Sequence, residues 1–211
     1  MSTIHDYGLF LFASVIVNLT PGQDTLYILG RSLGGGRRAG TAAALGIGVG
    51  SVCHTLAAAV GLSALLVASP KAFMAVKLAG AGYLIWIGIG LIRSKTVALP
   101  LETSASSDGR SLYGIFFQGL LTNALNPKVA LFYLSFLPQF IAADTGSKST
   151  ALLALGLSFV ATGTLWGLLL VRLADLFQAI FLRRPNLHAR LDGAFGLLLM
   201  GLGVHVLLSQ I

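Results

Sequence analysis

Long uncharged apolar runs constrain this chain more than any other feature of its sequence. Between Ala39 and Pro70 there are 32 consecutive residues without Asp, Glu, Lys or Arg, and the run from Ser149 to Val171 adds 23 more. A helix needs about 20 apolar residues to cross the hydrocarbon core of a bilayer. The runs therefore predict membrane-spanning helices and exclude an ordinary soluble domain.

The composition agrees with a lipid environment. Hydrophobic residues make up 55% of the 211 residues and charged residues only 10%, and the mean hydropathy is +0.85. A soluble domain carries roughly 25% charged residues. The net charge of +7 does not indicate nucleic-acid binding, because a nucleic-acid groove needs clustered cations on a water-exposed face.

Hydropathy divides the chain into six predicted spans. No basic region precedes the first apolar run, so we expect no cleaved signal peptide and a first run that stays as a span. The predicted spans are Tyr7–Gly30, Ala39–Ala68, Lys71–Ile92, Ser111–Ile141, Ser149–Ala174 and Leu191–Leu208.

The distribution of cations predicts the orientation of these spans. Three loops, between spans 1 and 2, 3 and 4, and 5 and 6, hold ten of the fourteen Lys and Arg residues. Cytoplasmic loops of membrane proteins carry such an excess, so we expect these loops inside and both termini outside. The ten cations are Arg31, Arg37, Arg38, Arg93, Lys95, Arg110, Arg172, Arg183, Arg184 and Arg190.

The two halves of the chain show an internal repeat. Tyr7 lies fourteen residues before Pro21, and Tyr113 lies fourteen residues before Pro127. Halves of three spans each must face opposite ways, as in the inverted repeats of many secondary transporters. We therefore expect an all-α polytopic membrane protein of six transmembrane helices in two inverted three-helix repeats. It forms one domain over residues 1–211, with repeat one about 1–95, a cytoplasmic loop about 96–110 and repeat two about 111–211.

Proline interrupts spans 1 and 4 at equivalent positions of the repeat. Proline lacks the backbone donor that continues a helix, so each span should stop and restart there. Thr20 is expected to cap the restart at Pro21, and Asn126 is expected to cap the restart at Pro127. Each restart presents helix-terminal amides at membrane depth, which suit a substrate carboxylate. The alternative is that the prolines only kink the two spans.

Two ionisable residues accompany the breaks. A charge at the bilayer centre costs at least about 2.5–3.5 kcal/mol, so such residues tend to be functional. Asp24 is predicted to hold a substrate ammonium or to exchange a proton; the alternative is an interfacial pair with Arg31 or another loop cation. Lys128 is predicted to receive a carboxylate or to pair with Asp24; the alternative is snorkelling along span 4.

Further residues give weaker signals. For His54 the sequence favours a hydrogen-bonded packing role over a proton relay. Tyr83 is a candidate for lining a cavity. The patterns Gly46-x-x-x-Gly50 and Gly163-x-x-x-Gly167 predict close helix contacts. The sequence predicts neither a cofactor nor a metal site, because its single cysteine and scattered acids form no ligand set.

Taken together, the motifs resemble the lysine and homoserine/threonine exporter family (LysE/RhtB) of bacterial inner-membrane proteins, over nearly the whole chain. The resemblance implies export of amino acids or close derivatives across the cytoplasmic membrane, driven by the proton gradient or the membrane potential. Gln23 departs from the family pattern, which usually has a second proline there. The matching residues are Asn18-Leu19-Thr20-Pro21-Gly22, Gly30-Arg31, Gly36-Arg37-Arg38-Ala39-Gly40, Lys77-Leu78-Ala79-Gly80-Ala81-Gly82-Tyr83-Leu84 with Gly88, Gly119-Leu120-Leu121-Thr122-Asn123, Asn126-Pro127-Lys128, and Phe132 with Phe136-Leu137-Pro138-Gln139-Phe140.

The resulting hypothesis is a secondary active exporter of amino acids or close derivatives that are either neutral and small or basic, as in the threonine, homoserine and lysine class. The alternatives are a channel for small neutral solutes and, less favoured, a divalent-metal exporter. An enzyme is not expected, because no H-E-x-x-H, G-x-S-x-G or paired aspartates are found. Expected partners are the amino acid, a proton and the lipid bilayer, without nucleic acid; a homodimer through glycine-rich faces stays open. The predicted substrate site comprises Asn18, Thr20, Pro21, Gly22, Asp24, Tyr83, Asn123, Asn126, Pro127 and Lys128, with Asp24 as the proton-coupling candidate.

Overall fold

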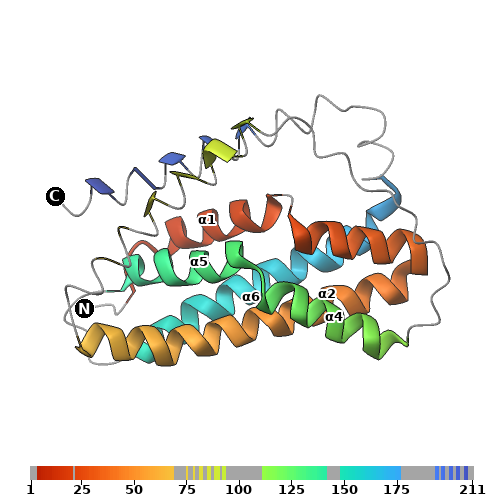
Figure 1. The fold of residues 1–211 in the computed structure, drawn as a ribbon, viewed down its shortest axis with the longest axis horizontal. Coiled ribbons are helices and arrows are strands. Elements are labelled where there is room, and N and C mark those ends of the chain that lie inside the picture. Colours follow the sequence, from red (N-terminus) through yellow and green to blue (C-terminus); the bar gives the residue numbers. More distant parts are fainter. Residues whose placement is uncertain are drawn as a thin grey trace.

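The computed structural model describes residues 4–20, 22–68, 111–141 and 148–176, and single positions between 75 and 93 and between 193 and 208. These residues are helical apart from short connections and one isolated bridge between Ile4 and Ile141 (Figure 1). The elements are α1 (Tyr7–Leu19), α2 (Gln23–Ala68), α4 (Leu112–Ala124), α5 (Pro127–Ser135), the 3₁₀-helix η1 (Leu137–Phe140) and α6 (Lys148–Arg172).

Both predicted proline breaks are confirmed. The first separates α1, which ends at Leu19, from α2, which begins at Gln23. The second separates α4, which ends at Ala124, from α5, which begins at Pro127. The predicted fourth span is therefore built from α4, α5 and η1, and the predicted fifth span agrees with α6 to within two residues at each end.

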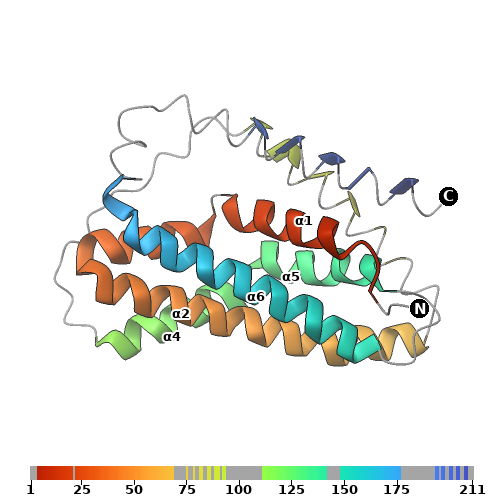
Figure 2. The same cartoon turned by 180° about the vertical axis from the view of Figure 1, so that it is seen from behind.

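The boundary between the first two predicted spans differs from the expected loop. Helix α2 continues through the Arg31–Arg38 region and is interrupted only at Gly36, where φ is 73° and ψ is −178°. This backbone conformation is accessible essentially to glycine alone. The parts of α2 before and after Gly36 run antiparallel to each other (Figures 1 and 2). A single glycine thus makes the turn for which the sequence suggested an eight-residue loop.

Two described helical stretches are long and apolar enough to cross a membrane: Gln23–Leu62, within which α2 turns back at Gly36, and Lys148–Arg172. The predicted spans Lys71–Ile92 and Leu191–Leu208 fall largely outside the described residues. Their described positions are helical and approach one another closely, because a Cβ atom on Gly88 would lie 2.5 Å from the carbonyl oxygen of Gly196.

Glycines allow α2 to pack tightly against α4. A Cβ atom on Gly50 would lie 2.7 Å from the carbonyl oxygen of Leu120, and one on Gly46 would collide with the α4 backbone. From the other side, a Cβ atom on Gly119 would lie 2.7 Å from the carbonyl oxygen of Ala43. The predicted close contact at Gly46-x-x-x-Gly50 is therefore confirmed, since only glycine permits this separation.

The opposite side of α2 packs against α6 by the same principle. A Cβ atom on Gly48 would lie 2.7 Å from the Thr164 hydroxyl oxygen. On α6, added Cβ atoms would lie 3.0 Å from the Asn18 amide oxygen at Gly163 and 3.1 Å from Ile28 Cδ1 at Gly167. Helix α2 is thus held between α4 and α6, and the second predicted glycine pattern also marks a close contact.

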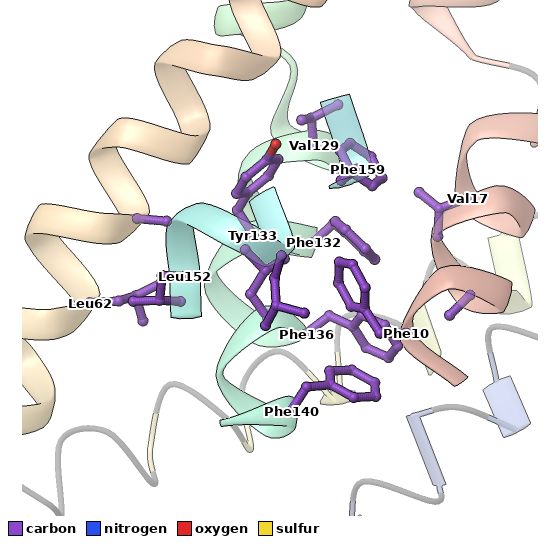
Figure 3. Packing of buried hydrophobic residues seen from close by; sticks show 14 of the residues in the cluster. Phe10, Val17, Leu62, Val129, Phe132, Tyr133, Phe136, Phe140, Leu152 and Phe159 are labelled. Atoms are coloured by element: carbon purple, nitrogen blue, oxygen red, sulfur yellow. The ribbon is translucent and has the colours of Figure 1, made fainter. Parts of the chain in front are cut away.

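An aromatic cluster joins the remaining helices on one side of the two breaks. Phe10 of α1 packs edge-on against Phe140 of η1 with ring centroids 5.3 Å apart, and Phe132 of α5 stacks on Phe159 of α6 at 4.5 Å. Figure 3 shows the rings of Phe10, Phe136 and Phe140 gathered between α1 and the α5–η1 segment. This cluster fixes α1 relative to α5, and so positions one break relative to the other.

The glycine contacts predict a stability difference between two glycine positions of one helix. Replacing Gly50 by Ala should lower the free energy of unfolding by about 1–3 kcal/mol, because the added methyl group overpacks the α2–α4 contact. Replacing Gly61 by Ala is the matched control, since nothing lies within 4 Å of a Cβ atom there. Thermal unfolding of the detergent-solubilised variants measures the difference. Equal melting temperatures for the two variants would contradict the packing described here.

Candidate functional site

The two breaks open into one shared cavity. Its volume is about 50 Å³, which holds a few water molecules. Apolar side chains of α1, α2, α5 and α6, among them Ile28, Phe159 and Leu170, form part of its wall. The predicted site residues that line it are Asn18, Thr20, Gly22, Asp24, Asn123, Asn126 and Lys128.

The first break is capped differently from the prediction. Thr20 ends α1, and both its backbone N–H and its hydroxyl donate to the carbonyl of Ile16, at 3.0 and 2.8 Å. The helix restarts at Gln23, and the first helical bond there runs from the Leu26 N–H to the Gly22 carbonyl at 3.0 Å. The expected Thr20 cap on the second half-helix is therefore wrong, because that helix begins at Gln23 and its first helical bond is made to Gly22.

The second break is capped as predicted. Asn126 is the N-cap of α5, and its side-chain oxygen accepts a hydrogen bond of 3.0 Å from the Lys128 N–H. Pro127 occupies the first helical position, where its missing N–H costs nothing. The short link between α4 and α5 is closed by a bond of 2.9 Å from the Asn126 N–H to the Asn123 carbonyl.

Asp24 lies in the first turn of α2 but makes its contacts to the second break. Its carboxylate accepts hydrogen bonds from the side-chain amides of Asn123 at 2.8 Å and Asn126 at 3.3 Å. Asn123 is 1% exposed and Asn126 is 5% exposed, so these bonds lie inside the protein. A carboxylate near the N-terminus of a helix also interacts favourably with the helix dipole.

The alternative of an Asp24–Arg31 pair is not what the structure shows. Arg31 donates to the Gln118 side chain at 2.8 Å and lies over the Tyr27 ring, 5.4 Å from its centroid. Tyr27 in turn donates to the carbonyl of Ile115 at 2.7 Å. Arg31 therefore links α2 to α4 through a hydrogen bond, while Asp24 faces the cavity.

Lys128 also crosses from one break to the other. Its ammonium donates to the carbonyls of Val17 at 3.2 Å and Thr20 at 3.1 Å, both at the C-terminal end of α1. The side chain is half-buried and turns inward, so the snorkelling alternative is wrong for this structure. Each break thus contributes one charged side chain that is held by the other break.

Asn123 is the centre of this arrangement. Its amide oxygen accepts from the Ser51 hydroxyl at 3.1 Å, while its amide nitrogen donates to Asp24. Its backbone carbonyl accepts from His54 Nε2 at 3.0 Å, so Nε2 carries a proton. The hydrogen-bonded role favoured for His54 agrees with this contact. Helix α2 therefore positions Asn123 through two residues about one turn apart, Ser51 and His54.

The structure adds a residue that the sequence analysis missed. Tyr133 of α5 is 1% exposed, and its ring stacks on His54 with centroids 5.6 Å apart. Its hydroxyl bonds to the Thr55 hydroxyl at 2.9 Å and donates to the Ser51 carbonyl at 3.2 Å. A buried tyrosine hydroxyl needs such a hydrogen-bond partner. Span 4 contains many aromatic residues, so its sequence does not single out Tyr133.

Asn18 links the first break to α6. Its side-chain amide donates to the Thr162 hydroxyl at 3.1 Å, next to the close contact at Gly163. Of the other predicted site residues, Gly22 borders the cavity, and a Cβ atom there would lie 3.7 Å from the Lys128 ammonium. Pro21 and Tyr83 lie outside the described residues. Among the residues that the structure describes, no group of three or more His, Cys, Asp and Glu side chains is placed to hold a metal ion.

Comparison with known proteins assigns the chain to a family. The family model of the LysE-type translocators matches residues 15–210. The chain therefore belongs to the LysE-type translocator family, as the motifs around the two breaks indicated. It is a membrane transport protein and not an enzyme.

Relatives extend over almost the full chain. A protein of Vibrio cholerae named "Uncharacterized membrane protein" is 30% identical over 203 residues, which cover 95% of this chain and 96% of the relative. A similarly named protein of Pseudomonas aeruginosa is also 30% identical, over 95% and 94% of the two chains. The leucine efflux protein of Enterobacter sp. (strain 638) is 27% identical over 93% of this chain and 92% of the relative. No solved structure matches the chain significantly.

Proposed function

We propose that this protein is a secondary exporter of amino acids across the cytoplasmic membrane, and that the amino acid binds in the cavity between the two breaks. The observation that carries the proposal is the presence of one carboxylate, Asp24, and one ammonium, Lys128, on the same cavity wall. Every amino acid carries the complementary pair of charges. Its ammonium pairs with Asp24, and its carboxylate is attracted to Lys128 and to the N-terminus of α5.

The cavity wall favours a neutral, apolar substrate side chain. Among the described lining residues Asp24 is the only acid, and it is needed for the backbone ammonium of the substrate. A basic side chain would require a second carboxylate, because burying an unpaired charge is costly. Ile28, Phe159 and Leu170 instead offer apolar surface. The relative named as a leucine efflux protein supports the same substrate class.

Asp24 is also the proposed coupling group. A carboxylate at membrane depth that alternates between proton and substrate ammonium gives proton exchange for amino-acid export. Moving one charge across the membrane supplies about 2.3 kcal/mol per 100 mV, which is enough to drive accumulation outside the cell. The breaks then serve as hinges in alternating access, because neither helix is continuous through the site.

The proposed layout is one domain of six spans in two inverted repeats, in the bacterial inner membrane with both termini outside. The equivalent breaks after Thr20 and Asn126 support it, as do the ten cations gathered between predicted spans 1 and 2, 3 and 4, and 5 and 6. Alkaline phosphatase, which is active only outside the cytoplasm, should be active when fused after Ile211. An inactive fusion, with a cytoplasmic reporter active at the same position, would contradict the proposed orientation.

Transport in proteoliposomes tests the proposed function. With an imposed pH gradient, reconstituted protein should move labelled leucine and exchange it in saturable counterflow, whereas lysine should move at least tenfold more slowly. Replacing Asp24 by Asn should reduce gradient-driven leucine flux at least tenfold, because the site loses its carboxylate. Replacing Asp175, an exposed acid after α6, by Asn is the matched control and should leave the flux unchanged.

Three outcomes would count against parts of this proposal. Flux of leucine without saturation or counterflow would indicate a channel. Full gradient-driven flux in the Asp24→Asn variant would exclude Asp24 as the coupling group. Faster transport of lysine than of leucine would contradict the assigned substrate class.

A further inference from the structure

Each proline at a break leaves one particular carbonyl without its helical donor. A helical N–H bonds to the carbonyl four residues earlier, and proline has no N–H. Pro21 therefore frees the carbonyl of Val17, and Pro127 frees the carbonyl of Asn123. The Val17 carbonyl accepts from the Lys128 ammonium at 3.2 Å, whereas the Asn123 carbonyl accepts from the Asn126 N–H at 2.9 Å and from His54 at 3.0 Å.

At the first break, the surroundings of the ammonium are those of a bound cation. Lys128 Nζ contacts two carbonyl oxygens, of Val17 and Thr20, at the C-terminal end of α1. That end of a helix carries the negative pole of its dipole. In other transporters with broken helices, such freed carbonyls and half-helix ends coordinate the coupling cation.

The position of Lys128 within its own helix does not stabilise its positive charge. It lies in the first turn of α5, next to the Asn126 cap, where the helix dipole disfavours a cation. Its favourable contacts lie instead on α1, across the cavity. Asp24 lines the same cavity, so the two fixed charges at membrane depth balance one another.

From this placement we infer that the Lys128 ammonium is a built-in cation at the first break, occupying the site that a soluble monovalent cation fills in sodium-coupled transporters of similar layout. Transport then needs neither Na⁺ nor K⁺ as a co-substrate. At the second break the Asn123 carbonyl is likewise occupied by donors of the chain itself, the Asn126 N–H and His54. The inference rests on the proposed export function and adds to it the source of positive charge at the site.

The first experiment uses the wild-type protein in proteoliposomes with leucine as substrate. Initial rates of leucine counterflow are compared in buffers that contain only choline, only Na⁺ or only K⁺ as the monovalent cation. The built-in ammonium predicts rates within twofold of one another in all three buffers. A tenfold stimulation by Na⁺ or K⁺ would overturn the inference, while absence of counterflow in every buffer would instead overturn the proposed export function.

The second experiment removes the Lys128 ammonium by substitution and tests whether a soluble alkylammonium restores transport. Replacing Lys128 by Ala should reduce counterflow in choline buffer at least tenfold, and propylammonium, which matches the deleted part of the side chain, should restore it at least threefold. Propan-1-ol has the same length without the charge and should restore nothing. Replacing Lys148, at the start of α6 and outside the cavity wall, by Ala is the matched control and should keep the wild-type rate.

Further variants at Lys128 distinguish loss of the positive charge from loss of the folded structure. Replacing Lys128 by Arg keeps a cation and should retain at least a third of the wild-type rate, whereas Lys128→Met should behave as Lys128→Ala. Wild-type rates for Lys128→Ala or Lys128→Met in choline would overturn the inference. So would equal recovery of Lys128→Ala by propan-1-ol and propylammonium, or no recovery by either in protein that elutes as the wild type does on size exclusion.

Discussion

The freed carbonyls at two interrupted helices are the constraint on which the rest of this structure depends. A backbone carbonyl without a donor is costly at membrane depth, so a break survives only where other groups complete its hydrogen bonds. Here the breaks complete one another: Lys128 of the second break bonds to the end of α1, and Asn123 and Asn126 bond to Asp24 of the first. The end of α1 at the first break is thus completed from the second break, and the two halves of the chain meet at this point.

The packing of the helices follows from the need to hold the breaks together. Helix α2 approaches both α4 and α6 closely because Gly46, Gly48 and Gly50 present no side chain at the contacts. This approach brings Ser51 and His54 within hydrogen-bond distance of Asn123. The aromatic cluster around Phe132 and Phe136 fixes α1, α5 and α6 on one side of the cavity, so the polar site is set in a rigid apolar frame.

Much of this arrangement could be predicted from the sequence because it depends on residues with strong local preferences. Proline and its flanking Asn marked the second break and its cap, and the glycine spacing marked the close helix contacts. The Thr20 cap failed because the second half-helix begins only at Gln23, three residues after Thr20, and spacing in the sequence does not fix where a helix restarts. The partners of Asp24 and Lys128 lie 99 to 111 residues away in the sequence, and Tyr133 is one aromatic residue among many. A single sequence carries no signal for such contacts.

The central claim is that the cavity between the breaks binds the amino acid, and protection from labelling tests it most directly. Cys53 is the only cysteine, so replacing it by Ser gives a background for single cysteines at Thr25 and Thr164, which line the cavity, and at Ser149, which lies outside it. Saturating leucine should slow the reaction of a water-soluble thiol reagent with the first two at least fivefold and leave the third unchanged. Equal labelling rates at Thr25 and Thr164 with and without leucine, in protein that still exchanges leucine, would contradict the claim.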